Sequence, residues 1–249
     1  MGLTREASPK LRVAKKPFSV PLRALRGSKR CSPRIAHASS IEYGRRYRVV
    51  PGAAVASISP VASVALFSKK PATAVCTIAL DSSSRTSITL TRILCAEWFD
   101  IKPEFVTMNP HLPAMLERCD AALLIGDIAL FVDHVGMGIE KYDLYDEWRG
   151  LTGLPFVFAF WTGRPDVLTP EHLHAIHASR DAGVAALNDI ARAHYPDDDK
   201  LAEIGGVYLH ENIQYRLDND CITSLQKFYA SAAKLGIIQQ ATPIRFYGD

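Results

Sequence analysis

The sequence is poor in cysteine and has no long apolar run. Its five cysteines are an odd number without a CxxC pair, a spacing that fits neither a disulfide framework nor a zinc site. We therefore expect reduced thiols in a reducing compartment. No stretch reaches the roughly 18 uninterrupted apolar residues of a membrane span, and residues 1–30 lack the apolar core of a secretory signal. These absences predict a cytoplasmic protein with no membrane-embedded part.

Charge is distributed unevenly along the 249 residues. Residues 1–39 hold ten Lys or Arg and a single acid, Glu6, for a net charge of +9, whereas the remainder carries −6. A basic end is typical of an arm that binds nucleic acid or a membrane surface. This one has little aromatic content and no nucleic-acid-binding motif, so we predict neither a nucleic-acid nor a membrane partner.

The same basic residues lack signals of regular structure. Pro9, Pro17, Pro21 and Pro33 interrupt any long helix, and the apolar residues follow neither a helical nor a strand period. We expect residues 1–39 to be poorly ordered. An Arg-rich, acid-poor composition also fits an organelle transit peptide, although the prolines disfavour the amphipathic helix of such a peptide.

From Ile41 onward the pattern becomes regular. Strand-like runs occur at Tyr47–Val50, Val61–Phe67, Val75–Leu80, Glu104–Met108, Ala121–Ile125 and Phe156–Trp161. Helical patterns cover Thr86–Trp98, His111–Arg118, Pro170 to about Ala193, part of Asp198–Leu217, and Cys221–Leu235, which Gly236 ends. The alternation in the middle of the chain predicts parallel strands joined by crossover helices.

An α/β middle followed by helices is typical of a two-lobed binding fold with the ligand in the cleft between the lobes. We expect residues 40–70 and 165–249 to form the first lobe and residues 71–164 to form the second. The chain would then cross between the lobes near Lys70–Ala72 and near Thr162–Pro165.

The clearest chemical signal is the segment Ala79-Leu80-Asp81-Ser82-Ser83-Ser84-Arg85-Thr86-Ser87, which follows a strand and opens a helix. The first N–H groups of a helix are unpaired and lie at the positive end of its dipole. With the hydroxyls of Ser84, Thr86 and Ser87 and the guanidinium of Arg85, this turn can bind a carboxylate or phosphate. The alternative is a plain helix cap with Arg85 in solvent. The turn lacks the glycines of a nucleotide-binding loop.

A second candidate is Gly126-Asp127, which follows the strand Ala121–Ile125. Carboxyl ends of parallel strands line the ligand crevice of an open α/β sheet, although Asp127 is equally typical of a helix cap. The aromatic residues Trp148 and Phe156 could wall a ring-shaped substrate, but core packing is the interpretation we favour.

Two further clusters are weaker candidates. No cysteine or carboxylate near the histidines completes a metal site, so we predict no metal. We favour a solvated loop for the carboxylates, which could otherwise serve as acids or bases. The histidines are His172, His174 and His177, and the carboxylates are Asp143, Asp146 and Glu147.

Segments along most of the chain resemble one family. They are Ser40-Ile41-Glu42-Tyr43, Ala53–Pro60 with Val61–Ser68, Leu80–Ser87, Ala121–Ala129, Tyr142-Asp143-Leu144 with Glu147-Trp148, Leu151–Ala159, and Tyr208-Leu209 with Asn212-Ile213 and Tyr215. In these segments the chain resembles the chorismate dehydratases of futalosine-type menaquinone synthesis, within a wider family that has a periplasmic-binding-protein type 2 fold. The resemblance spans about Ser40 to Ile238, and its most specific parts are Gly126-Asp127 and Thr152–Ala159.

The resemblance implies a lyase that converts chorismate, a small molecule, into 3-[(1-carboxyvinyl)oxy]benzoate with loss of water. Because the ring becomes aromatic, the reaction runs downhill and needs no cofactor. The base could be a side chain or a carboxylate of the substrate itself, so the catalytic residues stay unassigned. The implied substrate-binding residues are Ser40, Ser83, Ser84, Arg85, Thr86, Ser87, Gly126 and Asp127.

The opening strand of that family and its short Asn-containing turn are not legible in residues 1–39. We therefore expect the first lobe to be incomplete at its amino end, and a shifted reading frame or misassigned start upstream of about Ser39 is one hypothesis for the break. Three alternatives stay open: an enzyme like 1,4-dihydroxy-6-naphthoate synthase, a non-catalytic carboxylate-binding protein, and an inactive truncated relative. The sequence leaves the oligomeric state open.

Overall fold

The computed structural model describes residues 34–37 and 47–249, and all structural statements below concern these residues. Most of the basic amino-terminal segment and the predicted binding residue Ser40 lie outside them. Within residues 1–39, Arg34–His37 form strand β1, which the sequence did not predict. The expectations of poor order and of an incomplete first lobe otherwise fall on residues that are not described.

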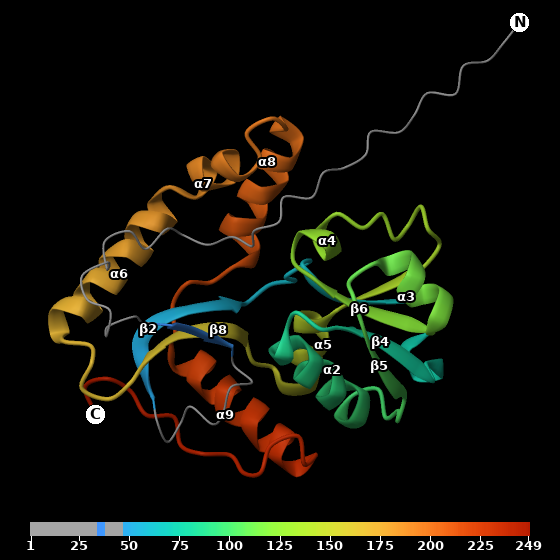
Figure 1. Ribbon diagram of the computed structural model, residues 1–249, viewed down its shortest axis with the longest axis horizontal. Helices are drawn as coiled ribbons and strands as arrows, with labels where there is room; N and C mark the ends of the chain where they lie inside the picture. Colours follow the sequence, from blue (N-terminus) through green and yellow to red (C-terminus); the bar gives the residue numbers. More distant parts are fainter. Residues whose placement is uncertain (1–33, 38–46) are drawn as a thin grey trace, which may run out of the picture.

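The middle of the chain forms a five-stranded sheet in the order β5-β4-β6-β3-β7 (Figure 1). The strands are β3 (Val64–Ser68), β4 (Thr77–Asp81), β5 (Glu104–Met108), β6 (Ala121–Ile125) and β7 (Glu140–Asp143). The predicted parallel arrangement is confirmed for β4 with β5 and for β4 with β6. Strand β3 instead runs antiparallel to its neighbours β6 and β7.

Helices cover both faces of this sheet, as the alternation of its buried side chains requires. Leu66, Ile78 and Leu123 face one side, where α2 (Arg85–Glu97) and α5 (Leu144–Thr152) pack. Phe67 and Leu124 face the other side, under α3 (Leu112–Arg118) and α4 (Asp127–Leu130). A short 3-10 turn, η2 (Ala72–Ala74), precedes β4.

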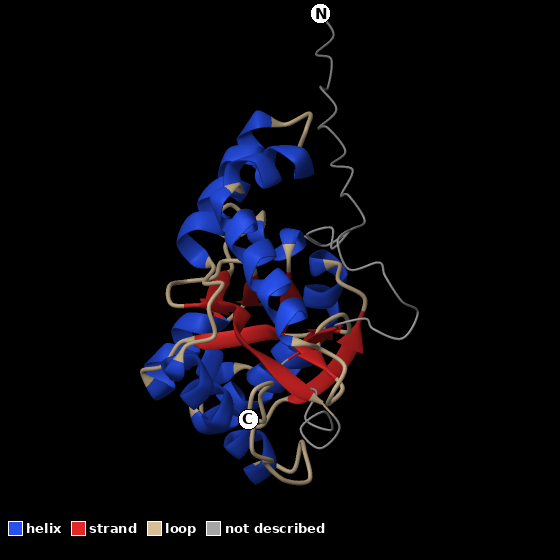
Figure 2. Cartoon of the chain, turned by 90° about the vertical axis from the view of Figure 1, so that its left-hand side faces the viewer, coloured by secondary structure: helices blue, strands red, loops and turns tan. Residues whose placement is uncertain are grey.

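A three-stranded antiparallel sheet in the order β1-β8-β2 lies beside the first (Figures 1 and 2). It contains β2 (Arg48–Ser57) and β8 (Phe156–Gly163), which pair with register shifts near Gly52, where φ is +69°. Glycine adopts this left-handed conformation without strain, so it suits the bulge.

The carboxyl-terminal third is helical, as predicted. Thr169 caps its first helix, and the side chain of His172 completes a capping box. The helices are α6 (Pro170–Ala185), α7 (Leu187–His194), α8 (Asp199–Val207), the π-helix η3 (Tyr208–Asn212) and α9 (Asn219–Lys234). The helix expected over Pro170 to Ala193 is therefore two helices, because Ala186 leaves the helical conformation with φ −121° and ψ 23°.

One apolar core connects the two sheets. It runs from the five-stranded sheet through Trp148 of α5 to Phe156 of β8 and Phe228 of α9. These three rings pack edge to face, with centroids 5.5–6.3 Å apart. Core packing, the favoured interpretation for Trp148 and Phe156, is thus their observed role. No described helix is both long and apolar enough to cross a membrane.

The chain crosses between the sheets earlier than expected at both places. Strand β3 belongs to the five-stranded sheet and β8 to the three-stranded sheet. The crossings therefore lie at residues 58–63 and 153–155, not near Lys70–Ala72 and Thr162–Pro165. Strand signals in the sequence give the position of each strand but not the sheet in which it finds its partners. The boundaries of the expected lobes, 40–70 with 165–249 and 71–164, therefore move to these two crossings.

Candidate functional site

The ends of β4 and β6 and the start of β3 meet at one edge of the five-stranded sheet, and they define the candidate site. The register of β4 against β6 pairs Leu80 with Leu123, so both strands end at this edge. Strand β3 starts there, because Val64 pairs with Ile125 at the end of β6. The carboxyl ends of such strands form the ligand crevice of open α/β sheets. We call this edge the crevice edge.

The serine turn, residues 81–87, leaves β4 at the crevice edge. Ser84 is the N-cap of α2, since its Oγ accepts the N–H of Ser87 at 3.2 Å and lies 3.0 Å from Ser87 Oγ. The N–H of Ser83 donates to Asp81 Oδ1 at 2.8 Å, which closes the turn. Ser84, Thr86 and Ser87 are buried, and the hydroxyls of Ser84 and Ser87 hold the turn together.

Other groups of the turn face solvent. The side chains of Ser82, Ser83 and Arg85 are exposed. The guanidinium of Arg85 makes no hydrogen bond or ion pair with the part of the chain that the structure describes. The serine turn therefore separates a buried set that builds the helix cap from an exposed set that is available to an anion at the start of α2.

Gly126 and Asp127 form the second part of the crevice edge. Gly126 has φ 72° and ψ −154°, a conformation almost confined to glycine, and its N–H donates to Ser63 O at 2.7 Å. Asp127 then begins α4, and its Oδ2 lies 3.2 Å from Nε2 of His194 at the end of α7. This pair joins α4 to α7. The sequence did not predict a role for His194.

Two hydroxyls lie at the same edge, and the sequence did not single them out either. Ser63 Oγ and Tyr208 Oη are 3.0 Å apart. Burial raises the pKa of Tyr208 and outweighs the hydrogen bond with Ser63, while the negative charge of Asp127 acts in the same direction as burial. Tyr208 therefore stays a neutral phenol that can donate a hydrogen bond.

The carboxylate of Asp143 holds the first crossing in place. Its Oδ2 accepts the N–H of Ala62 at 2.5 Å, and its Oδ1 accepts the N–H of Tyr145 at 2.9 Å and so caps α5. Ala62 has φ +58°, an uncommon conformation for a residue with a side chain. Burial raises the pKa of Asp143 despite these N–H donors. A solvated loop was the wrong interpretation for Asp143, and Asp146 and Glu147 lie on α5.

The π-helix η3 clamps the same crossing from the other side. Ser57 Oγ donates to Asn212 O and Ser59 Oγ donates to Glu211 O, both at 2.6 Å. Asn212 Nδ2 donates to Pro60 O at 2.5 Å. Single turns of π-helix occur frequently at functional sites. The sequence gives no periodic signal for such a turn, so this clamp could not be predicted.

Two of the three histidines considered for a metal have structural contacts, and the third, His174, is exposed. The ring of His172 belongs to the capping box of α6, and Nε2 of His177 lies 2.7 Å from Pro51 O at the bulge of β2. Within the described residues no group of three His, Cys, Asp or Glu side chains is arranged to hold a metal ion.

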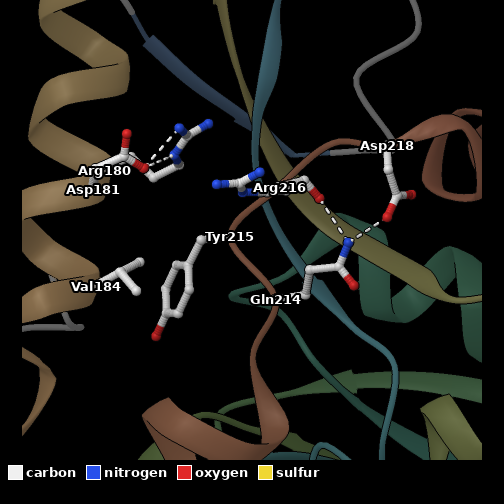
Figure 3. A pocket seen from close by; sticks show the side chains of 7 residues that line it. All are labelled: Arg180, Asp181, Val184, Gln214, Tyr215, Arg216 and Asp218. Atoms are coloured by element: carbon white, nitrogen blue, oxygen red, sulfur yellow. Dashed lines mark hydrogen bonds and ion pairs between the residues drawn. The ribbon is translucent and has the colours of Figure 1, made fainter.

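A separate hollow of about 310 Å³ lies between α6 and residues 214–218 (Figure 3). Most of its polar groups already have partners: Arg180 pairs with Asp181, and Gln214 donates to Asp218. The hollow takes no residue from the five-stranded sheet. It is therefore distinct from the crevice edge, and none of the substrate-binding residues predicted from the sequence lines it.

Comparison with known proteins supports both the fold and the family. A family model described as menaquinone biosynthesis matches residues 33–234. A curated chorismate dehydratase of Thermus thermophilus is 30% identical over 161 residues, which cover 58% of this chain and 59% of that protein. The match thus spans about three fifths of the curated relative.

Three solved structures share the architecture. A protein from Archaeoglobus fulgidus has a TM-score of 0.63 at 20% identity, covering 83% of this chain and 80% of its own. The periplasmic aliphatic sulphonate binding protein of Escherichia coli gives 0.56 at 12%, covering 87% and 77%. The ligand-binding component of an ABC-type import system from Staphylococcus aureus gives 0.54 at 10%, covering 84% and 75%. The predicted two-lobed α/β fold of the periplasmic-binding-protein kind is confirmed.

Proposed function

Because this chain belongs to the menaquinone-biosynthesis family, we propose that it is a chorismate dehydratase, a lyase that removes water from chorismate to give 3-[(1-carboxyvinyl)oxy]benzoate in the futalosine pathway. The observation that carries the proposal is the serine turn at the crevice edge, where exposed Ser83 and Arg85 stand at the start of α2. The curated relative favours this activity over that of a 1,4-dihydroxy-6-naphthoate synthase.

The serine turn is suited to one carboxylate of chorismate. The positive end of the α2 dipole favours an anion, and the guanidinium of Arg85 can form two parallel hydrogen bonds with a carboxylate. The cap formed by Ser84 and Ser87 keeps the turn in one conformation. A preorganised turn loses little freedom when the ligand binds.

The remaining groups of the crevice edge would orient the ring and assist departure of the hydroxyl. Tyr208 is a neutral phenol beside Ser63, so it can donate a hydrogen bond to an oxygen that gains negative charge. Proton removal falls to a crevice side chain or to a carboxylate of the substrate, and the proposal holds with either base.

The test is to incubate the purified chain with chorismate and to follow the product by chromatography and ultraviolet absorbance. Formation of the enolpyruvyl benzoate supports the proposal. Calorimetry on the same sample separates the two ways of failing: chorismate binding without product indicates a non-catalytic binding protein, and no binding by a folded sample indicates an inactive relative.

Arg85→Ala tests the anion site directly. A charge-assisted hydrogen bond contributes about 1.5–3 kcal/mol, so the variant should bind chorismate about ten- to a hundredfold more weakly. Arg118→Ala is the matched control, because Arg118 is also exposed on a helix but lies in the last turn of α3, before β6 begins. Equal affinity of the Arg85 variant and wild type by calorimetry would remove Arg85 from the site.

A further inference from the structure

Helices α7 and α8 form a hairpin, residues 187–207, that projects beyond the three-stranded sheet (Figures 1 and 2). Its apolar residues Leu187 and Ala191 form a small cluster with Leu209 of η3. It shares no buried residue with the main core that connects the two sheets, although Tyr208 and Tyr215 pack against both. The hairpin helices therefore contribute no buried side chain to the core between the sheets, which lets them shift more freely than α9.

The two ends of the hairpin differ in rigidity. At one end, Ala186 interrupts the helix between α6 and α7. At the other, α8 continues into η3, whose last residues are tied to the first crossing through Ser57 and Ser59. These ends allow the hairpin to move as a unit that bends at Ala186 while its base at η3 stays fixed.

The tip of the hairpin contacts α4 at the crevice edge. Nε2 of His194 lies 3.2 Å from Oδ2 of Asp127, and both side chains are mostly buried, with 15% and 25% of their areas exposed. The ring of Tyr195 packs edge to face on Phe131, with centroids 5.9 Å apart. Burial, reinforced by the charge of Asp127, raises the pKa of Tyr195, so its phenol stays neutral beside this carboxylate.

Both sides of this contact are positioned by glycines. Gly126 fixes the start of α4 in a conformation that other residues rarely adopt. On the other side, a Cβ added to Gly205 of α8 would lie 3.3 Å from the ring of Tyr195, so glycine lets that ring pack closely on the hairpin. A glycine on each side thus fixes the position of the groups that make the contact.

The opposite side of the molecule is joined much more firmly. There α9 buries Phe228 in the core shared with α5 and β8. Trp148 Nε1 donates to Ser224 Oγ at 3.0 Å, and Ser231 Oγ donates to Glu97 Oε2 at 2.8 Å. The hairpin reaches α4 through contacts of His194 and Tyr195 with Asp127 and through the ring contact with Phe131, so we expect this side to open before the side that is held by a continuous apolar core.

We propose that the hairpin is a lid over the crevice edge and that His194 and Tyr195 latch it to Asp127 and Phe131. The lid opens at the latch to admit a ligand to the serine turn, and it closes to exclude water from the crevice. The latch forms in the chain without ligand. The inference rests on the proposed function only where it names chorismate as the ligand.

Hydrogen–deuterium exchange on the full chain without ligand tests the latch. In His194→Ala and in Asp127→Asn, amides of residues 187–207 should exchange about tenfold faster than in wild type, as expected when one charge-assisted contact of a closed state is lost. Amides of α9 and α2 should keep their wild-type rates. His174→Ala is the matched control, since His174 is an exposed histidine on the adjoining helix α6.

Wild-type exchange rates in the hairpin of both variants would overturn the proposal. Equal acceleration in α9 would also overturn it, because it would show general destabilisation instead of a local opening. Asp127→Asn also alters the contact with the Tyr195 phenol, so the double variant should exchange no faster than Asp127→Asn alone. Added chorismate should slow exchange in the wild-type hairpin. If it does not, the proposed function is contradicted, while the ligand-free comparison still decides the latch.

Discussion

Two neighbouring serines of the serine turn should respond to alanine in opposite ways. Ser84 is buried, caps α2 and contacts Ser87 Oγ, whereas Ser83 is exposed and its side chain has no partner among the described residues. Ser84→Ala should therefore reduce stability, and Ser83→Ala should reduce ligand binding. Each variant is the matched control of the other.

The magnitudes follow from these contacts. Loss of a serine N-cap costs about 1 kcal/mol, and the buried Ser87 hydroxyl left without Ser84 raises the loss toward about 2 kcal/mol. For a chain of this size, each kcal/mol lowers the melting temperature by roughly 2–4 °C. A Ser83 hydroxyl that donates to a carboxylate contributes about 1.5 kcal/mol or more, so Ser83→Ala should weaken chorismate binding about tenfold or more.

Calorimetric melting and chorismate titration of both variants give the two readouts. The reasoning is refuted if Ser83→Ala lowers the melting temperature as much as Ser84→Ala, or if Ser84→Ala melts like wild type. In either case the division of the serine turn into a buried cap and an exposed binding set would be incorrect.

Gly126→Ala should cost about 1–3 kcal/mol, because its φ and ψ suit only glycine; an unchanged urea midpoint would contradict this. Asp143→Asn should cost about 1–3 kcal/mol, since both carboxylate oxygens accept backbone N–H groups and an amide would direct N–H₂ at one of them; wild-type stability in urea would count against it. Burial alone would raise the pKa of Asp120, but the ammonium of Lys70 and two backbone N–H groups hold it at about 2. Because this pKa is lower in the folded state, the ionised Asp120 stabilises the fold above about pH 4, and this contribution is lost as the pH falls toward 2. In Asp120→Asn the urea midpoint should fall less steeply between pH 5 and pH 2 than in wild type. An equally steep fall would show that the Asp120–Lys70 pair does not cause the loss of stability in acid.

Local sequence signals predicted the elements whose pattern is self-contained. The buried runs of β4 and β6 and the serine cap of α2 were all legible, because burial and capping depend on residues close in sequence. Strand β7 was missed because it has only four residues, three of them charged, and lies at the edge of the sheet, where it has a neighbouring strand on one side only.

The candidate site was predictable only in part for the same reason. The serine turn and Gly126-Asp127 can each be recognised from a few neighbouring residues. The burial of their side chains cannot, so the sequence could not separate Ser83 from Ser84. His194 meets Asp127 across 67 positions, and Tyr208 meets Ser63 across 145. Such contacts arise from topology, which no local pattern in one sequence contains.

The order of the strands has a consequence for how the chain folds during synthesis. All strands of the five-stranded sheet lie between residues 64 and 143, so this unit can form once that continuous stretch has emerged. The three-stranded sheet must wait for β8, about a hundred residues after β2, and the core around Phe228 must wait for α9. The five-stranded unit is therefore expected to fold first and to serve as the template on which the later, discontinuous half assembles.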